Sequence, residues 1–84
     1  MPQINLKLFA NLSHFMPGDA VRNEVVYECD NDNSINSILQ GLNVPLENCH
    51  LVIVNGVFIP AEQRDSHILA DGDTLAVWPP VAGG

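Results

Sequence analysis

The glycine pair Gly83-Gly84 is the part of this 84-residue sequence with the most direct chemical use. It follows Pro79-Pro80, whose rings fix φ near about −65° and favour an extended course. Glycine has no Cβ and adopts backbone angles closed to other residues. At about 3.1 Å per residue, the stretch 79–84 reaches at most about 19 Å, enough to enter a partner's narrow cleft. We therefore expect the Gly84 α-carboxylate to be presented on a thin stalk; a frayed terminus is the alternative.

This carboxylate becomes reactive only after activation. An α-carboxylate has a pKa near about 3.5 and is ionised at neutral pH, so it is a poor electrophile until one oxygen becomes a leaving group. Adenylation by ATP creates that leaving group, a persulfide can attack the acyl-adenylate, and reductive cleavage leaves a thiocarboxylate that can deliver sulfur. Each step needs the terminus inside an enzyme pocket, where side chains on the last two residues would collide. Gly83 and Gly84 meet that requirement.

The rest of the chain lacks a convincing catalytic set. The three histidines, His14, His50 and His67, have no metal-ligand spacing, so we predict no metal site. No glycine-rich phosphate loop is present, and the segment 71–73 (Asp-Gly-Asp) places two carboxylates where a phosphate would need amides. An iron–sulfur cluster would require four cysteines, and the sequence has two. We expect no resident cofactor.

The two cysteines are predicted to be reduced thiols, because they are too few for a disulfide framework and lack Cys-x-x-Cys spacing. Cys49 precedes His50, which suggests a nucleophile with its base. Adjacent residues in extended chain point to opposite faces, so these two side chains would not meet. A structural role is therefore the favoured interpretation.

Charge and length limit the partners. Three basic residues, Lys7, Arg22 and Arg64, face ten acidic ones, which gives a net charge of −7 and disfavours nucleic acid and anionic membrane as partners. A protein with a basic docking groove fits this charge, and so does plain solubility. The N-terminus has no leader pattern and the longest apolar run, 51–54, is too short to span a bilayer. We expect a single domain in the cytoplasm.

The first half of the chain predicts two strands and one helix. Residues 3–9 alternate, with Ile4, Leu6 and Leu8 on one face and Asn5, Lys7 and Phe9 on the other. A second strand is expected at 24–29, antiparallel to the first after a long connection. Ser34 is a good N-cap for a helix over 35–42, whose aliphatic residues recur at helical spacing, and Val44-Pro45 ends it.

The second half predicts three strands. Residues 51–54 are continuously apolar, as expected for an inner strand covered on both faces. Asn55-Gly56 predicts a two-residue hairpin into a short return strand at 57–59. The Asp-Gly-Asp turn at 71–73 leads into a last strand at 74–78.

This element order predicts an α+β roll of the ubiquitin or β-grasp type, with one main helix packed across a mixed sheet of four or five strands. The domain is expected to span residues 1–78, with a flexible tail over 79–84 that ends in Gly-Gly. In such a roll the final strand is central, so the tail emerges from the most rigid part of the sheet.

The stretch 69–84, with the ending Pro-Pro-Val-Ala-Gly-Gly, closely resembles the end of the MoaD/ThiS family of ubiquitin-like sulfur carriers, and within it the molybdopterin synthase small subunits. Upstream, residues 6–12 and Val52 with Asn55-Gly56 are similar to the first strand and the Val-Asn-Gly hairpin of many members. The resemblance covers nearly the whole chain.

The resemblance implies that Gly84 is adenylated by an ATP-dependent ubiquitin-activating-type adenylyltransferase and then sulfurated. It implies sulfur donation to a pterin precursor on the large subunit of molybdopterin synthase, or to an equivalent acceptor enzyme. Catalytic residues then belong to the partners, and this chain is not itself an enzyme. The tail residues expected to thread the partner's active site are Pro79, Pro80, Val81, Ala82 and Gly83. Candidates for an exposed docking patch are Phe9, Phe58 and Trp78, with a core position as the alternative for each.

The connection 11–22, with His14, Phe15 and Pro17, departs from the usual short form of the family. It leaves open the acceptor pathway, because molybdenum, tungsten, thiamine and tRNA thiolation would all use the same tail chemistry. A ubiquitin-like modifier joined through Gly84 to other proteins is the alternative class, although Lys7 is the only lysine on which polymers could grow. A plain interaction domain with an incidental tail is the third.

Overall fold

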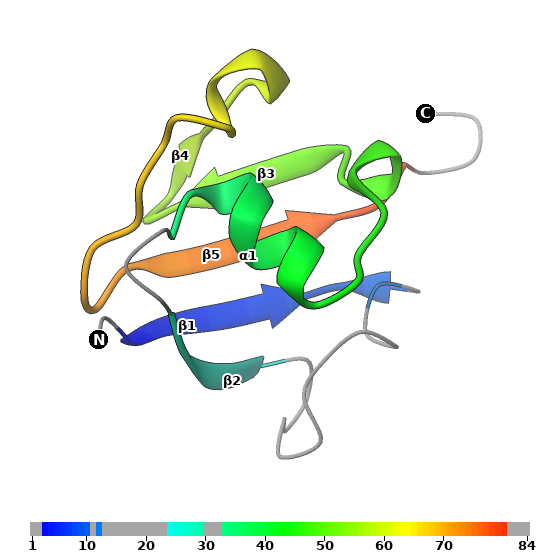
Figure 1. Cartoon of the computed structure of the whole chain (residues 1–84). Helices are drawn as coiled ribbons and strands as arrows, with labels where there is room; N and C mark the ends of the chain where they lie inside the picture. The colour runs from blue at the N-terminus through cyan, green and yellow to red at the C-terminus, as the bar shows by residue number, and fades with distance from the viewer. Residues whose placement is uncertain (1–2, 11, 13–23, 30–32, 81–84) are drawn as a thin grey trace.

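The fold is a mixed five-stranded sheet with one helix across it. The structure is a computed structural model and describes residues 3–10, 12, 24–29 and 33–80. The elements are β1 (Gln3–Leu8), β2 (Glu24–Glu28), α1 (Ile35–Gly41), β3 (Leu51–Val54), β4 (Val57–Phe58) and β5 (Thr74–Trp78), with short 3₁₀ turns at Leu46–Asn48 and Ala61–Gln63. The sheet order is β2-β1-β5-β3-β4, with β1 and β5 parallel and the other pairs antiparallel (Figure 1). The predicted β-grasp class is confirmed.

The alternation in β1 builds one wall of the core. Ile4, Leu6 and Leu8 are at most 1% exposed, as predicted. Leu6 lies opposite Val25 of β2 and Leu75 of β5, so three strands direct apolar side chains to the same face. The antiparallel pairing of the first two strands is also confirmed.

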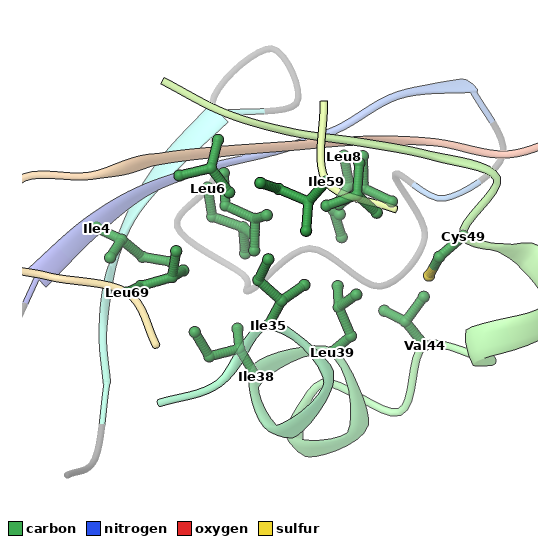
Figure 2. Close-up of a cluster of buried hydrophobic side chains, with 14 of the residues drawn as sticks. Ile4, Leu6, Leu8, Ile35, Ile38, Leu39, Val44, Cys49, Ile59 and Leu69 are labelled. Atoms are coloured by element: carbon green, nitrogen blue, oxygen red, sulfur yellow. The ribbon is translucent and has the colours of Figure 1, made fainter. Parts of the chain in front are cut away.

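Helix α1 covers that face. The Ser34 hydroxyl accepts a hydrogen bond from the Ser37 N–H at 3.2 Å, which makes Ser34 the predicted N-cap. Ile35, Ile38 and Leu39 point from the helix toward the sheet side chains (Figure 2). The helix ends at Gly41, one residue before the predicted end, with Leu42 as its C-cap. Packing against the sheet therefore stabilises a helix too short to be stable alone.

The β3–β4 hairpin turns at the predicted Asn55-Gly56. Both residues have positive φ, 51° and 84°, as a type I′ turn requires. Strand β4 is shorter than predicted and ends at Phe58. Ile59, predicted in this strand, is 5% exposed and joins the core.

The prediction that residues 51–54 are covered on both faces is wrong. Val52 and Val54 are buried, whereas Leu51 and Ile53 are only half-buried. The physical reason is that α1 covers one face of the sheet, while no other described element covers the opposite face (Figure 1). We call this opposite side the open face.

The final strand occupies the predicted central place. β5 lies between β1 and β3, and its Leu75 and Val77 are fully buried. The turn at 71–73 precedes it, with Gly72 at φ 89°. Of the connection 11–22, only Leu12 is described, and its side chain is 1% exposed. Within the described ranges, no helix has the length and apolar character needed to cross a membrane.

Candidate functional site

The root of the tail is the end of β5. The Trp78 carbonyl accepts a hydrogen bond from the His50 N–H at 3.0 Å, and on the other side the Val77 carbonyl accepts one from the Phe9 N–H at 3.1 Å. Pro79 and Pro80 follow, and proline has no N–H to continue a ladder. Pro79 is half-buried and Pro80 is exposed. The sheet therefore releases the chain at Trp78.

The structure describes only the first two residues of the predicted tail, Pro79 and Pro80. Val81, Ala82, Gly83 and Gly84 lie outside the residues that the structure describes. Their roles as threading segment and sulfur attachment point remain predictions.

Two of the three predicted docking aromatics are in contact at this root. The rings of Phe9 and Trp78 have centroids 4.4 Å apart and planes inclined by 4°, which is a stacked arrangement. Both side chains are half-buried. Neither is a core residue, because α1 and the core lie on the opposite face of the sheet.

The third aromatic, Phe58, lies on the same face but across β3. Its side chain is 52% exposed, and Ile53 is its direct cross-strand neighbour. Ile53 also lies opposite Ala76 of β5, while Leu51 lies opposite Trp78. These residues lie side by side on the open face and form the open-face patch, made of Phe9, Leu51, Ile53, Phe58, Trp78 and Ala76, of which Ala76 is only 8% exposed.

Sequence reasoning missed Leu51, Ile53 and Ala76. The available signal was the hairpin itself, because a two-residue turn at Asn55-Gly56 sets Ile53 opposite Phe58. Residues directly opposite on antiparallel strands share a face, so an exposed Phe58 implies an open-face Ile53.

A polar margin borders the open-face patch on the side of β1 and β2. Lys7 lies between Ala76 on one neighbouring strand and Glu24 on the other. Glu28 and Val26 occupy the same face of β2, and Val26 is 61% exposed. The open face therefore changes from apolar at β3 and β5 to charged at β2.

The geometry of Cys49 and His50 supports a structural role. Cys49 is 5% exposed and its Sγ lies 3.5 Å from the Pro45 carbonyl, whereas His50 is exposed. Burial raises the pKa of the Cys49 thiol, and the nearby charge of Arg64 opposes this only in part. Neither cysteine is in a disulfide. A buried thiol with a raised pKa is a poor nucleophile.

The two carboxylates of the 71–73 turn accept hydrogen bonds from other parts of the domain. Asp71 accepts a hydrogen bond from the Gln3 N–H at 2.8 Å, and Asp73 accepts from the Ala70 N–H at 2.8 Å and the Asn55 side chain at 2.9 Å. Among the residues described, no group of three or more His, Cys, Asp or Glu could hold a metal ion, and His14 lies outside that part.

A comparison with protein-family models identifies the family. Residues 1–83 match the model described as Mut7-C ubiquitin. The chain belongs to the Mut7-C ubiquitin family. A comparison with curated proteins gave no match.

Solved structures share the fold of this Mut7-C ubiquitin chain. The HVO 2177 protein of Haloferax volcanii has a TM-score of 0.75 at 23% identity, over 99% of this chain and 87% of its own. A putative molybdopterin converting factor, subunit 1, from Pyrococcus furiosus has a TM-score of 0.65 at 18% identity, over 96% and 100%. SAMP1 from Haloferax volcanii has a TM-score of 0.61 at 25% identity, over 98% and 99%.

The predicted resemblance to ubiquitin-like proteins of the MoaD/ThiS kind is confirmed by these findings. This fold supports a role as a sulfur carrier or as a ubiquitin-like modifier.

Proposed function

We propose that this chain is a sulfur carrier whose Gly84 α-carboxylate is adenylated, converted to a thiocarboxylate and used to deliver sulfur, most directly in molybdopterin or tungstopterin biosynthesis. The proposal includes Gly84 as the free end of the mature protein. The observation that carries it is the position of the tail root: the central strand β5 releases the chain at Trp78, within the open-face patch.

This position supports two separate contacts with an activating enzyme, one through the open-face patch and one through the tail. The open-face patch provides apolar area for docking, with the stacked Phe9 and Trp78 at the end from which the tail leaves. A partner docked there lies beside Pro79, and residues 79–84 reach at most about 19 Å further. The carboxylate can therefore enter an active site while the folded domain stays outside it.

The chemistry then proceeds on the partners. The Gly84 carboxylate oxygen attacks the α-phosphorus of ATP and releases pyrophosphate, which gives the acyl-adenylate. The terminal sulfur of a persulfide attacks the acyl carbon and AMP leaves. A two-electron reductant, such as a pair of thiols, cleaves the resulting acyl disulfide to a thiocarboxylate and a thiol. An acceptor enzyme, such as a molybdopterin synthase large subunit, holds the pterin precursor that receives the sulfur. No step needs a catalytic side chain of this chain.

The test is an ATP-dependent loading reaction. The protein is incubated with a ubiquitin-activating-type adenylyltransferase, ATP and a persulfide donor, and its intact mass is measured. We expect one oxygen to be replaced by sulfur at Gly84. A variant that lacks Gly84 should stay unmodified and fully folded. An unchanged mass for the native sequence, with the same enzyme shown to load its own carrier, would contradict the proposal.

A ubiquitin-like modifier is the second candidate, favoured by the likeness to SAMP1 over nearly the full length of both chains. In that case Gly84 would form an isopeptide bond with lysines of other proteins. Extracts blotted for this protein would contain slower-migrating conjugates that disappear when Gly84 is deleted. Their absence, together with sulfur loading, would select the carrier.

A further inference from the structure

Arg64 is a buried cation whose side-chain hydrogen bonds go to backbone carbonyl groups. The residue is 5% exposed, and its donors contact the carbonyl oxygens of Ile59 (Nε, 3.0 Å), Cys49 (Nη1, 2.7 Å) and His50 (Nη2, 3.3 Å). A buried guanidinium usually needs a carboxylate to offset its desolvation. Here the hydrogen bonds go to neutral carbonyls, and burial lowers the pKa of Arg64, which the nearby Cys49 and Glu62 side chains oppose only in part. Such an arrangement fixes the loop before β3 at two points, Cys49 and His50, and joins it to the chain just after β4 at Ile59.

One of these acceptors belongs to the peptide group that holds the end of β5. The Cys49 carbonyl and the His50 N–H are parts of one planar peptide group. Arg64 Nη1 donates to its oxygen at 2.7 Å, and its N–H donates to the Trp78 carbonyl at 3.0 Å. Hydrogen bonds in series polarise one another, and a charged donor at the start gives the strongest effect. Arg64 therefore strengthens the bond at Trp78.

That bond lies where the tail begins. It is made to the last residue of β5, next to the Leu51–Trp78 pair, and the following Pro79 cannot donate a further ladder bond. If it opens, the Leu51–Trp78 pair loses its neighbouring hydrogen bond, and the chain can leave the sheet earlier, toward Val77. The tail then gains length and freedom at its base, and the Trp78 ring is no longer held in its stack with Phe9.

We propose that Arg64 is a positioning residue for the tail, because it fixes the point at which the chain leaves the sheet. It thereby sets the separation between the open-face patch and Gly84 when an activating enzyme is bound. This inference rests on the proposed function. Since Trp78 belongs both to the patch and to the tail root, a small shift there displaces the carboxylate in the partner's active site, where about 1 Å can cost about 100-fold in rate.

A purely structural role for Arg64 must be separated from this one. Its own backbone carbonyl accepts a hydrogen bond from the Asn36 N–H at 3.2 Å, so a backbone shift caused by substitution would also affect the start of α1. The opposite end of the same β3–β5 ladder offers a matched control. There the Asn55 N–H donates to the Thr74 carbonyl at 3.0 Å, and the Asp73 carboxylate holds the Asn55 side chain at 2.9 Å. Asp73→Asn weakens the ladder at the end far from the tail.

The experiment compares Arg64→Gln, Arg64→Lys and Asp73→Asn with the native chain at a temperature where all are folded. Amide hydrogen exchange is measured at His50 and Asn55, and kcat/KM is measured in the loading reaction. Arg64→Gln should raise His50 exchange about tenfold relative to Asn55. Asp73→Asn should do the reverse. Loading should fall about tenfold in Arg64→Gln and stay within about twofold in Asp73→Asn. Arg64→Lys, which keeps the charge but not the planar set of donors, should be intermediate.

Two results would overturn the inference. If His50 exchange does not rise relative to Asn55 in Arg64→Gln, or in Arg64→Lys should the glutamine variant fail to fold, Arg64 does not hold the tail root. If loading falls equally in Arg64→Gln and Asp73→Asn, its effect is one of general stability. Failure of the native chain to load at all would contradict the proposed function instead, and the exchange measurements would still decide whether Arg64 holds the tail root.

Discussion

Single polar side chains fix both ends of the central strand. At the start of β5, the Asp73 carboxylate joins its own turn to the hairpin through Ala70 and Asn55. At its end, Arg64 acts through the Cys49–His50 peptide group. Neither role could be predicted from residue type, since an aspartate in a turn and an arginine in a loop are usually solvated. Both depend on contacts that are distant along the chain.

Asp73 gives a stability prediction with a defined pH dependence. The hydrogen bonds from Ala70 and then from Asn55 hold the pKa of Asp73 below its ordinary value of 3.8. Because the folded pKa is the lower one, the stabilisation is fully present above the unfolded value and is lost as pH falls through the folded value. Asp73→Asn should lower the free energy of unfolding by about 1 kcal/mol at pH 7, since these bonds are partly exposed.

Denaturant unfolding of Asp73→Asn and the native chain, at pH 7 and at a pH well below 3.8, measures this difference. The gap between the two proteins should narrow in acid. A gap that is the same at both pH values would show that the carboxylate charge contributes nothing.

At the scale of elements, the strands, the helix and their order followed from periodicity, the Ser34 cap and the Asn55-Gly56 turn. The sequence misled on β3. A continuous apolar run fits a strand covered on both faces, and also a strand with one core face and one docking face. The hydrophobic pattern of the sequence does not distinguish these two kinds of strand, because an apolar docking surface has the composition of a core. The tertiary arrangement decides it, since α1 is the one α-helix among the described residues and it covers a single face of the sheet.

The open-face patch is the surface on which we propose that the activating enzyme docks. Phe58→Glu should raise the KM of the loading reaction about tenfold or more, because a buried charge at a docking surface is unfavourable. The fold should be nearly unaffected, since Phe58 is 52% exposed. Val26→Glu is the matched control, with the same charge change at a residue that is 61% exposed on the same face but on β2, outside the patch.

Steady-state loading kinetics and thermal unfolding of the two variants provide the measurement. Equal KM values for Phe58→Glu and Val26→Glu would contradict a docking role for the open-face patch.

At the scale of the whole molecule, the core and the proposed docking surface lie on opposite faces of one sheet. The face under α1 holds the core and supplies stability (Figure 2). The open face holds the patch, and the central strand delivers the tail at its border. The net charge of −7 would add long-range attraction if the proposed partner has a basic docking groove. Under the proposed function, this division would let the chain end be modified repeatedly without disturbing the fold.

The central claim is that the chemical work is done at the carboxyl group of Gly84. The most direct measurement is the intact mass and C-terminal peptide mass of the protein isolated from its own cells, with thiocarboxylates trapped by alkylation during lysis. The account predicts a chain that ends at Gly84, with a fraction alkylated on a terminal sulfur. A mature chain that continues past Gly84, or a terminus that never carries sulfur or an attached protein, would contradict it.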